Sequence, residues 1–241
     1  MNPISQPLLC QAIKRGRKAK MKPEMPLEDI YRALYGAFGH QQWWPADTAE
    51  EVVIGAVLAQ NVAWENAQRA IHGLKENELL SLAAIDQSDT AVIAPLIRPS
   101  RFYKQKAQRL KNLSALLFDR FGGSLETMFA AELYELRGAL KQLSGFGDET
   151  VDSILLYAAE KPIFVIDAYT RRIFARLGLI PADWRYRDCQ RFFMERLPAD
   201  LDLYQDYHAQ IVKLGSGICK KQKPRCAECP IRLCCQMTDP N

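Results

Sequence analysis

The chain has 241 residues, of which 48% are hydrophobic and 25% are charged, which is ordinary for a globular protein. No run of about 18 apolar residues occurs and the N-terminus lacks an apolar secretory segment, so we expect neither a membrane span nor secretion. The formal net charge is +4, but residues 14–22 alone carry six cations, so the rest of the chain is slightly acidic.

Residues 1–23 combine clustered cations with prolines and little periodicity, which predicts a disordered basic tail. After this tail, apolar residues recur at helical spacing and no stretch alternates with period two, so the sequence predicts an all-α fold. The first helix is marked by Leu27, Ile30, Leu34 and Phe38. Thr48 and Glu51 form a capping box before a second helix. Further helices are expected over 64–75, 104–121, 131–143, 149–160, 168–177, 187–196 and 201–215.

Two short segments are basic although the chain after the tail is not. Residues 98–111 hold six cations and no acid, and residues 220–232 hold five cations and one acid. Such clusters are typical of phosphate contacts on one face of a protein, although solvated surface lysines give the same pattern.

A glycine-rich turn interrupts the helical pattern at residues 143–150, Leu-Ser-Gly-Phe-Gly-Asp-Glu-Thr. Gly145 and Gly147 would let the backbone turn with positive φ. The helix that resumes at Thr150 would then begin with exposed N–H groups that can hold a DNA phosphate. A plain helix–turn–helix corner is the alternative interpretation.

This turn resembles the L-P-G-V-G-x-K-T hairpin of endonuclease III-type DNA glycosylases. The segment Ile166-Asp167-Ala168-Tyr169 resembles the V-D-T-H segment of that family. The resemblance implies a two-lobed helical fold of the helix-hairpin-helix (HhH-GPD) class, acting in base excision repair on double-stranded DNA that contains a damaged base. It also implies that Asp167 is the catalytic residue.

Asp167 has a simpler interpretation as well, because it precedes the helix expected over 168–177 and aspartate is among the best N-caps. As a catalytic group, its carboxylate would stabilise the oxocarbenium-like sugar cation and help to deprotonate water. The two roles can coexist in one side chain.

A cysteine cluster occupies the end of the chain with the spacing C-x6-C-x2-C-x5-C, formed by Cys219, Cys226, Cys229 and Cys235. Four thiolates hold either tetrahedral zinc or an iron–sulfur cubane, and the spacing alone does not choose between them. The spacing at this place resembles the [4Fe–4S] loop of endonuclease III and adenine-mismatch glycosylases. This resemblance implies a structural cluster that presents Lys220 and Lys221 to phosphate.

Two departures from endonuclease III concern the chemistry. The hairpin lysine that forms a Schiff base in bifunctional members is replaced by Glu149, which cannot form an imine. The histidine of V-D-T-H is replaced by Tyr169. Both favour a monofunctional enzyme that uses water and has no lyase activity.

Three further segments, 43–45, 55–61 and 98–103, resemble the 3-methyladenine DNA glycosylase III family, which also has a glutamate at position 149. The resemblance covers about residues 40–180 and implies an alkylated purine such as 3-methyladenine as substrate. The type enzyme of that family lacks the iron–sulfur loop.

The predicted base pocket consists of Trp43, Trp44, Trp64, Glu149 and Tyr169. An N-alkylated purine is cationic, and aromatic rings attract a cation by roughly 0.5–2 kcal/mol per well-placed ring. Taken singly, each tryptophan is better explained as a core residue, but two adjacent tryptophans favour a loop with at least one of them exposed.

Base extrusion leaves a gap in the stack, and the family fills it with two intercalating side chains. Gln60, on the face of Val53 and Val57, matches the first, and Phe102, beside Arg101, matches the second. Polar surface and core aromatic positions are the alternatives.

The sequence thus predicts a helical domain over 46–160 that contains the hairpin, and an iron–sulfur domain formed by 24–45 and 161–241. We expect a monomeric, cytoplasmic, nucleoid-associated bacterial glycosylase. Its rivals are a bifunctional or mismatch glycosylase, acting on oxidised pyrimidine or on thymine or uracil opposite guanine, and a non-catalytic iron–sulfur or zinc DNA-binding module.

Overall fold

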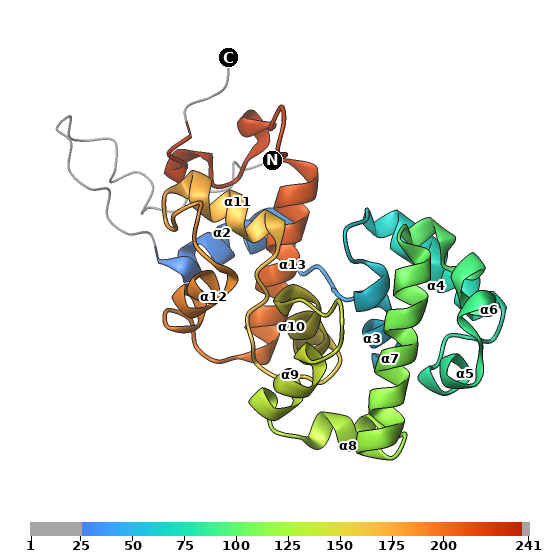
Figure 1. The fold of residues 1–241 in the computed structure, drawn as a ribbon. Helices are drawn as coiled ribbons and strands as arrows, with labels where there is room; N and C mark the ends of the chain where they lie inside the picture. Colours follow the sequence, from blue (N-terminus) through green and yellow to red (C-terminus); the bar gives the residue numbers. More distant parts are fainter. Residues whose placement is uncertain (1–25, 238–241) are drawn as a thin grey trace, which may run out of the picture. The chain divides into compact units, whose positions relative to one another are not determined.

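The computed structural model describes residues 26–237, and within this range it contains helices and turns but no strand, which confirms the all-α prediction (Figure 1). The tail predicted over 1–23 lies outside the described residues. No helix within 26–237 is both long enough and apolar enough to cross a membrane.

The chain divides into two compact units, and each is described by itself below. Unit 2 is the continuous stretch Trp44–Val165, while unit 1 combines the described residues up to Trp43 with those from Ile166 onward. The sequence placed the corresponding boundaries at 46 and 160.

Unit 2 packs its helices around α3 and α7. Its helices are α3 (Ala49–Leu58), α4 (Trp64–Glu76), α5 (Leu82–Gln87), α6 (Thr90–Leu96), η2 (Arg98–Ser100), α7 (Tyr103–Phe121), α8 (Leu125–Ala130), α9 (Leu133–Lys141) and α10 (Asp148–Tyr157). Helix α3 contacts α4, α7 and α10, and its residues from Val52 to Leu58 are all buried. The sequence predicted an apolar stripe there, but from Val52 onward the helix is enclosed on every side.

The capping box forms only in part. The Thr48 side chain accepts a hydrogen bond from the Glu51 N–H at 3.1 Å, which satisfies one unpaired donor of the first turn. The Glu51 carboxylate, however, accepts from the N–H of Asp47 at 3.3 Å, one residue before the cap.

Three helices were not predicted from the sequence: α5, α6 and α8. Each spans less than two turns, which is too short for a helical apolar repeat to become visible. Serine caps at Ser81 and Ser124 begin two of them, and the third contains Pro95 in its last turn.

Unit 1 consists of α2 (Leu27–Phe38), α11 (Ala168–Leu177), α12 (Tyr186–Met194), α13 (Leu201–Gly217), η3 (Cys226–Glu228) and η4 (Arg232–Cys234). The rings of Phe174, Phe193 and Tyr207 pack edge-on in its core, and the ring centroids of Phe174 and Phe193 are 4.7 Å apart. The Tyr207 hydroxyl donates to the Leu27 carbonyl at 2.8 Å, so α13 anchors the start of α2.

Candidate functional site

The predicted hairpin forms between α9 and α10, but its two glycines differ. Gly145 has φ +83°, which favours glycine, and a Cβ there would also force the guanidinium of Arg109 to move. Gly147 is the N-cap of α10 with φ −73° and ψ 169°, an extended conformation open to any residue. The prediction of positive φ is therefore wrong for Gly147. A Cβ at Gly147 would meet nothing within 4 Å, so the space in front of α10 is open.

An ion-pair network braces this hairpin. Arg137 donates to Asp152 at 2.7 Å and to Asp148 at 2.9 Å, and Lys141 lies 3.0 Å from Asp148. Although partial burial acts in the other direction, Lys141 and Arg137 hold the pKa of Asp148 below its ordinary value. The network therefore neutralises an acid in the first turn of α10, where negative charge would oppose a phosphate.

Gln60 lies two residues beyond α3 and is half-buried against the hairpin. Its Nε2 donates to the Gly145 carbonyl at 3.1 Å and to Thr150 Oγ1 at 2.9 Å, and its Oε1 accepts from Arg109. The structure thus brings three predicted DNA contacts together, and sequence reasoning missed Arg109, which joins them.

Arg101 and Phe102 form an exposed turn between η2 and α7. Phe102 is 60% exposed, and both residues have positive φ, 57° and 43°. Conformations of this kind cost roughly 1–3 kcal/mol each and persist only where the surroundings hold them. Phe102 is therefore not a core aromatic residue.

Only half of the basic cluster predicted at 98–111 is free to meet phosphate. Lys106 is fully buried, Lys111 donates to the carbonyls of Ile85 and Asp86, and Arg109 contacts Gln60. The exposed cations of the cluster are Arg98, Arg101 and Lys104.

Asp167 is the N-cap of α11, as its simpler interpretation predicted. Its Oδ1 accepts from the Thr170 N–H at 2.6 Å and from the Thr170 hydroxyl at 2.7 Å. The other oxygen, Oδ2, lies 3.7 Å from Nε2 of His208 on α13. Asp167 is 7% exposed, so the cap fixes one oxygen of a nearly buried carboxylate and leaves the second turned toward a histidine.

His208 was missed by sequence reasoning, because a single histidine on a helix carries no recognisable spacing. It is 5% exposed, and burial lowers its pKa below the ordinary value of 6.5, although Asp167 acts in the opposite direction. His208 is therefore neutral at pH 7.

Glu149 and Tyr169 occupy different environments. Glu149 is exposed in the first turn of α10. The Tyr169 ring packs against Gly215, where a Cβ would come within 2.6 Å of it, and the Arg172 guanidinium lies 5.0 Å from the ring centroid. Tyr169 is thus held by contacts within unit 1.

The predicted aromatic residues of unit 2 meet one another. Trp44 and Trp64 lie edge-on with ring centroids 5.2 Å apart, and Tyr157 lies 5.6 Å from Trp44. Both tryptophans are half-buried, and Trp44 stands in a loop, as the pair of adjacent tryptophans predicted.

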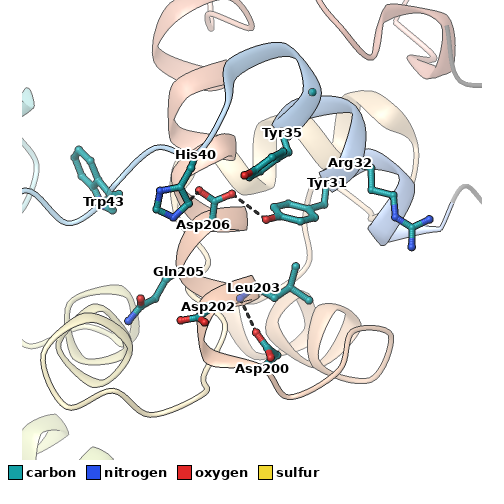
Figure 2. A pocket seen from close by; sticks show the side chains of 11 residues that line it. Tyr31, Arg32, Tyr35, His40, Trp43, Asp200, Asp202, Leu203, Gln205 and Asp206 are labelled. Carbon is teal, nitrogen blue, oxygen red and sulfur yellow. Dashed lines mark hydrogen bonds and ion pairs between the residues drawn. The ribbon is translucent and has the colours of Figure 1, made fainter. Parts of the chain in front are cut away.

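Trp43 lines a cavity of about 850 Å³ within unit 1, between α2 and the start of α13 (Figure 2). Asp206 lies at the wall of this cavity, where it accepts from Tyr31 at 3.0 Å and from the Gln41 N–H at 3.1 Å. His40 lies 3.7 Å from the same carboxylate. Of the three acids that line this cavity, Asp206 is therefore already satisfied from within the protein.

The four predicted cysteine ligands line one cavity of about 110 Å³. Arg176 donates to Cys219 Sγ at 3.1 Å, and the Cys235 thiol donates to the Arg176 carbonyl at 3.4 Å. Burial and the three neighbouring cysteines raise the pKa of the Cys229 thiol to about 11. No group of three or more His, Cys, Asp or Glu side chains within 26–237 is itself arranged to hold a metal ion.

Lys220 and Lys221 follow the first cysteine with exposed side chains. Arg176 donates to their two carbonyls at 2.8 and 3.1 Å, and Arg172 donates to the Cys219 carbonyl at 2.9 Å. Two arginines of α11 therefore hold the start of the basic loop by its backbone and leave its lysines in solvent.

Comparison with known proteins identifies the family. The sequence profile of the HhH-GPD superfamily of base excision DNA repair proteins matches residues 54–199. The chain belongs to this superfamily. It is a DNA glycosylase of base excision repair, and the profile covers the hairpin, Asp167 and most of unit 2.

One relative, a candidate DNA repair glycosylase of Methanocaldococcus jannaschii (MJ1434), is 44% identical over 86% of this chain and 94% of its own. The 3-methyladenine DNA glycosylase of H. pylori, solved with 1,N6-ethenoadenine, is 27% identical, with a TM-score of 0.69 over 79% of this chain and 97% of its own. An endonuclease III–DNA complex at 21% identity shares the fold, with a TM-score of 0.76 over 90% and 96% of the two chains.

These relatives support the predicted family and fold, but not the predicted bacterial origin, because the Methanocaldococcus protein is archaeal.

Proposed function

We propose that this glycosylase is monofunctional and, as a monomer, hydrolyses the N-glycosidic bond of N-alkylated purines such as 3-methyladenine in double-stranded DNA. The observation that carries the proposal is the combination of a nearly buried carboxylate at Asp167 with a glutamate at position 149. The first suits a reaction that develops positive charge on a sugar, and the second removes the nucleophile that a lyase needs.

Asp167 would act through Oδ2, since Oδ1 is engaged by Thr170. A carboxylate so held keeps its orientation while the sugar becomes oxocarbenium-like, and preorganised charge of this kind needs no rearrangement during the reaction. The same oxygen can take a proton from the attacking water, which forms the new C1′–O bond as the bond to the base breaks.

Neither Lys141 nor Lys106 is placed to replace the missing nucleophile of the hairpin. Lys141, the cation on the preceding helix, pairs with Asp148 at 3.0 Å. Lys106 has a lowered pKa, as a Schiff-base lysine requires, but its ammonium is buried among three backbone carbonyls. These contacts support hydrolysis without strand cleavage.

The substrate class rests on charge. N3- or N7-alkylation makes a purine cationic and a good leaving group, so the enzyme needs recognition of the base more than acid catalysis. The edge-on pair Trp44 and Trp64 offers aromatic surface of the kind that attracts such a cation. The likeness to a 3-methyladenine DNA glycosylase at 27% identity supports the same class.

We further propose that Cys219, Cys226, Cys229 and Cys235 hold a [4Fe–4S] cluster. Their side chains line one cavity, and four cysteine thiols are the donor set that such a cluster requires, although they would have to close around it because they are not arranged to hold a metal ion as they stand. When bound, the cluster would close the C-terminal loop and hold Lys220 and Lys221 toward the DNA backbone.

Base release from a panel of duplexes of one sequence tests the reaction. The panel carries 3-methyladenine, 7-methylguanine, hypoxanthine, thymine glycol, and thymine or uracil opposite guanine. We expect release of the alkylated purines, and neither nicking nor a borohydride-trapped adduct on an end-labelled abasic duplex. A trapped adduct would establish a bifunctional enzyme, and release of thymine or uracil alone a mismatch enzyme.

Substitution of the tryptophans tests the pocket. Trp44→Leu and Trp64→Leu keep apolar area but remove the π face, so kcat/KM for 3-methyladenine should fall by about five- to thirtyfold, and less for neutral hypoxanthine. Trp184→Leu is the matched control, since Trp184 is half-buried against Phe192 in unit 1. Equal losses for both bases would show that the two tryptophans do not recognise the positive charge of the alkylated base.

A further inference from the structure

Lys106 is a charged side chain with no access to solvent. It lies in the first turn of α7, is 0% exposed, and donates from Nζ to the carbonyls of Leu58 at 2.8 Å, Gln60 at 2.9 Å and Ser100 at 2.6 Å. All three acceptors are backbone oxygens, so the ammonium has a complete set of hydrogen bonds without a carboxylate.

A buried ammonium stabilises the fold less than an apolar side chain would. Burying an ammonium carries a desolvation penalty, and an apolar residue of the same length would avoid it. Burial and, secondarily, Arg109 lower the pKa of Lys106 to about 8, which still leaves the ammonium form dominant at neutral pH. The carbonyl of Leu58 is the last of α3, where the helix dipole favours a cation.

The three carbonyls come from the end of α3 and from two turns, and in each turn the next residue has a positive φ. Gln60 precedes Asn61, which has φ 55°, and Ser100 precedes Arg101, which has φ 57° and ψ 165°. The second conformation is one that glycine alone adopts readily. Lys106 therefore binds the peptide group next to a positive-φ residue in each turn, and one of these residues, Arg101, is strained.

These two turns carry the side chains that the sequence predicts to enter the DNA stack, Gln60 and Phe102. Arg109, one turn further along α7, holds the Gln60 side chain and lies over Gly145 of the hairpin. One face of α7, with Lys106 and Arg109, thus contacts all three DNA-facing turns of unit 2.

We propose that Lys106 is a positioning residue that fixes the spacing of the Gln60 turn and the Phe102 turn, so that the two side chains enter the duplex together. The inference rests on the proposed function, since it assumes that both side chains enter DNA. In this role the Lys106 ammonium contributes to base extrusion and takes no part in breaking the glycosidic bond.

Lys106→Met and a matched control, Lys111→Met, test this assignment. Lys111 lies on the same helix and also donates to two backbone carbonyls, but at the end of α5, away from both turns. Entry into the stack is followed by the fluorescence of 2-aminopurine beside a non-cleavable abasic analogue, which needs no catalysis. Base release is then compared for a paired lesion and for the same lesion in single-stranded DNA.

We expect Lys106→Met to lose at least tenfold in kcat/KM on the paired lesion and at most about threefold on the single strand, with a reduced 2-aminopurine signal. Lys111→Met should lose equally little on both. Equal losses for Lys106→Met on the two substrates, or failure of both Lys106→Met and Lys106→Gln to fold, would overturn the proposal, because Lys106 would then support the fold alone.

A double-mutant cycle tests separately whether Lys106 acts through the two turns. If Lys106 acts through the two turns, Lys106→Met should add less than about threefold to the loss already caused by Gln60→Ala with Phe102→Ala, whereas full additivity contradicts the proposal. A wild-type enzyme that raises 2-aminopurine fluorescence but releases no alkylated purine would refute the proposed substrate and leave the role of Lys106 standing.

Discussion

Asp167 shows how one carboxylate serves the fold and, as we propose, the chemistry. Its Oδ1 caps α11 through the N–H and hydroxyl of Thr170, while Oδ2 lies toward His208. The two hydrogen bonds of the cap fix the orientation of the Asp167 carboxylate relative to α11. Because asparagine is as good an N-cap as aspartate, the two functions can be separated by substitution.

We expect Asp167→Asn to abolish base release while the duplex affinity stays within about tenfold, because the negative charge acts on the transition state rather than on binding. The melting temperature should stay close to that of the wild type, since the cap is kept. Retained turnover in this variant would remove Asp167 from the reaction.

His208 gives a pH-dependent contribution whose sign follows from burial. Its pKa in the folded state is lowered below 6.5, so the unfolded chain binds more protons at acidic pH and stability falls as pH drops below about 6.5. His208→Asn should lose less stability between pH 7 and pH 5, by up to about 1.4 kcal/mol per pH unit for a single group. Urea unfolding of both proteins at the two pH values measures the difference, and parallel losses would contradict it.

At the scale of the element, the two glycines of the hairpin have different roles: Gly145 allows a positive φ, and Gly147 leaves open space in front of α10. Gly145→Ala places a Cβ at positive φ and into Arg109, so it should cost roughly 1–3 kcal/mol of folding free energy. Gly147→Ala has ordinary φ and open space, so stability should be unchanged. If the space before α10 receives a phosphate, Gly147→Ala should nevertheless weaken duplex binding by tenfold or more.

Chemical denaturation and duplex titration of both variants check this pair. An unchanged affinity for Gly147→Ala would mean that the open space is not the phosphate site, and the helix N-terminus would lose its assigned role.

The helices that the sequence predicted well are those whose signals are local. Helix α11 begins at its Asp167 cap and ends before Gly178, which has φ 73°. Helices α5, α6 and α8 were missed because they span less than two turns. The sequence also could not show that Lys106 is buried, since its three carbonyls meet only after α3, η2 and α7 have packed.

At the scale of the whole molecule, the C-terminal loop is held at its start by arginine side chains of α11. Arg172 and Arg176 hold residues 219–221, while residues 226–235 are short 3-10 turns around the cysteine cavity. If a cluster fills that cavity, Cys226→Ala should give colourless protein that is cleaved by protease beyond residue 221. Unit 2, which contains none of these residues, should keep its protection.

Cys189→Ala is the control, because Cys189 is buried on α12 outside the loop and its loss should leave the colour unchanged. Stoichiometric zinc in the wild-type protein, with no broad absorption near 400 nm, would refute the iron–sulfur assignment.

The discontinuity of unit 1 has a consequence for synthesis on the ribosome. Tyr31 bonds to Asp206, and Tyr207 bonds to Leu27, across separations of 175 and 180 residues. Among the described helices, α2 is translated first but cannot bury its apolar face until α13 has been translated, whereas all of unit 2 is complete by then. His208, the partner of Asp167, also arrives with α13. A nascent or prematurely terminated chain can thus hold a folded hairpin unit without its finished carboxylate site, so it could contact DNA without cutting bases from it.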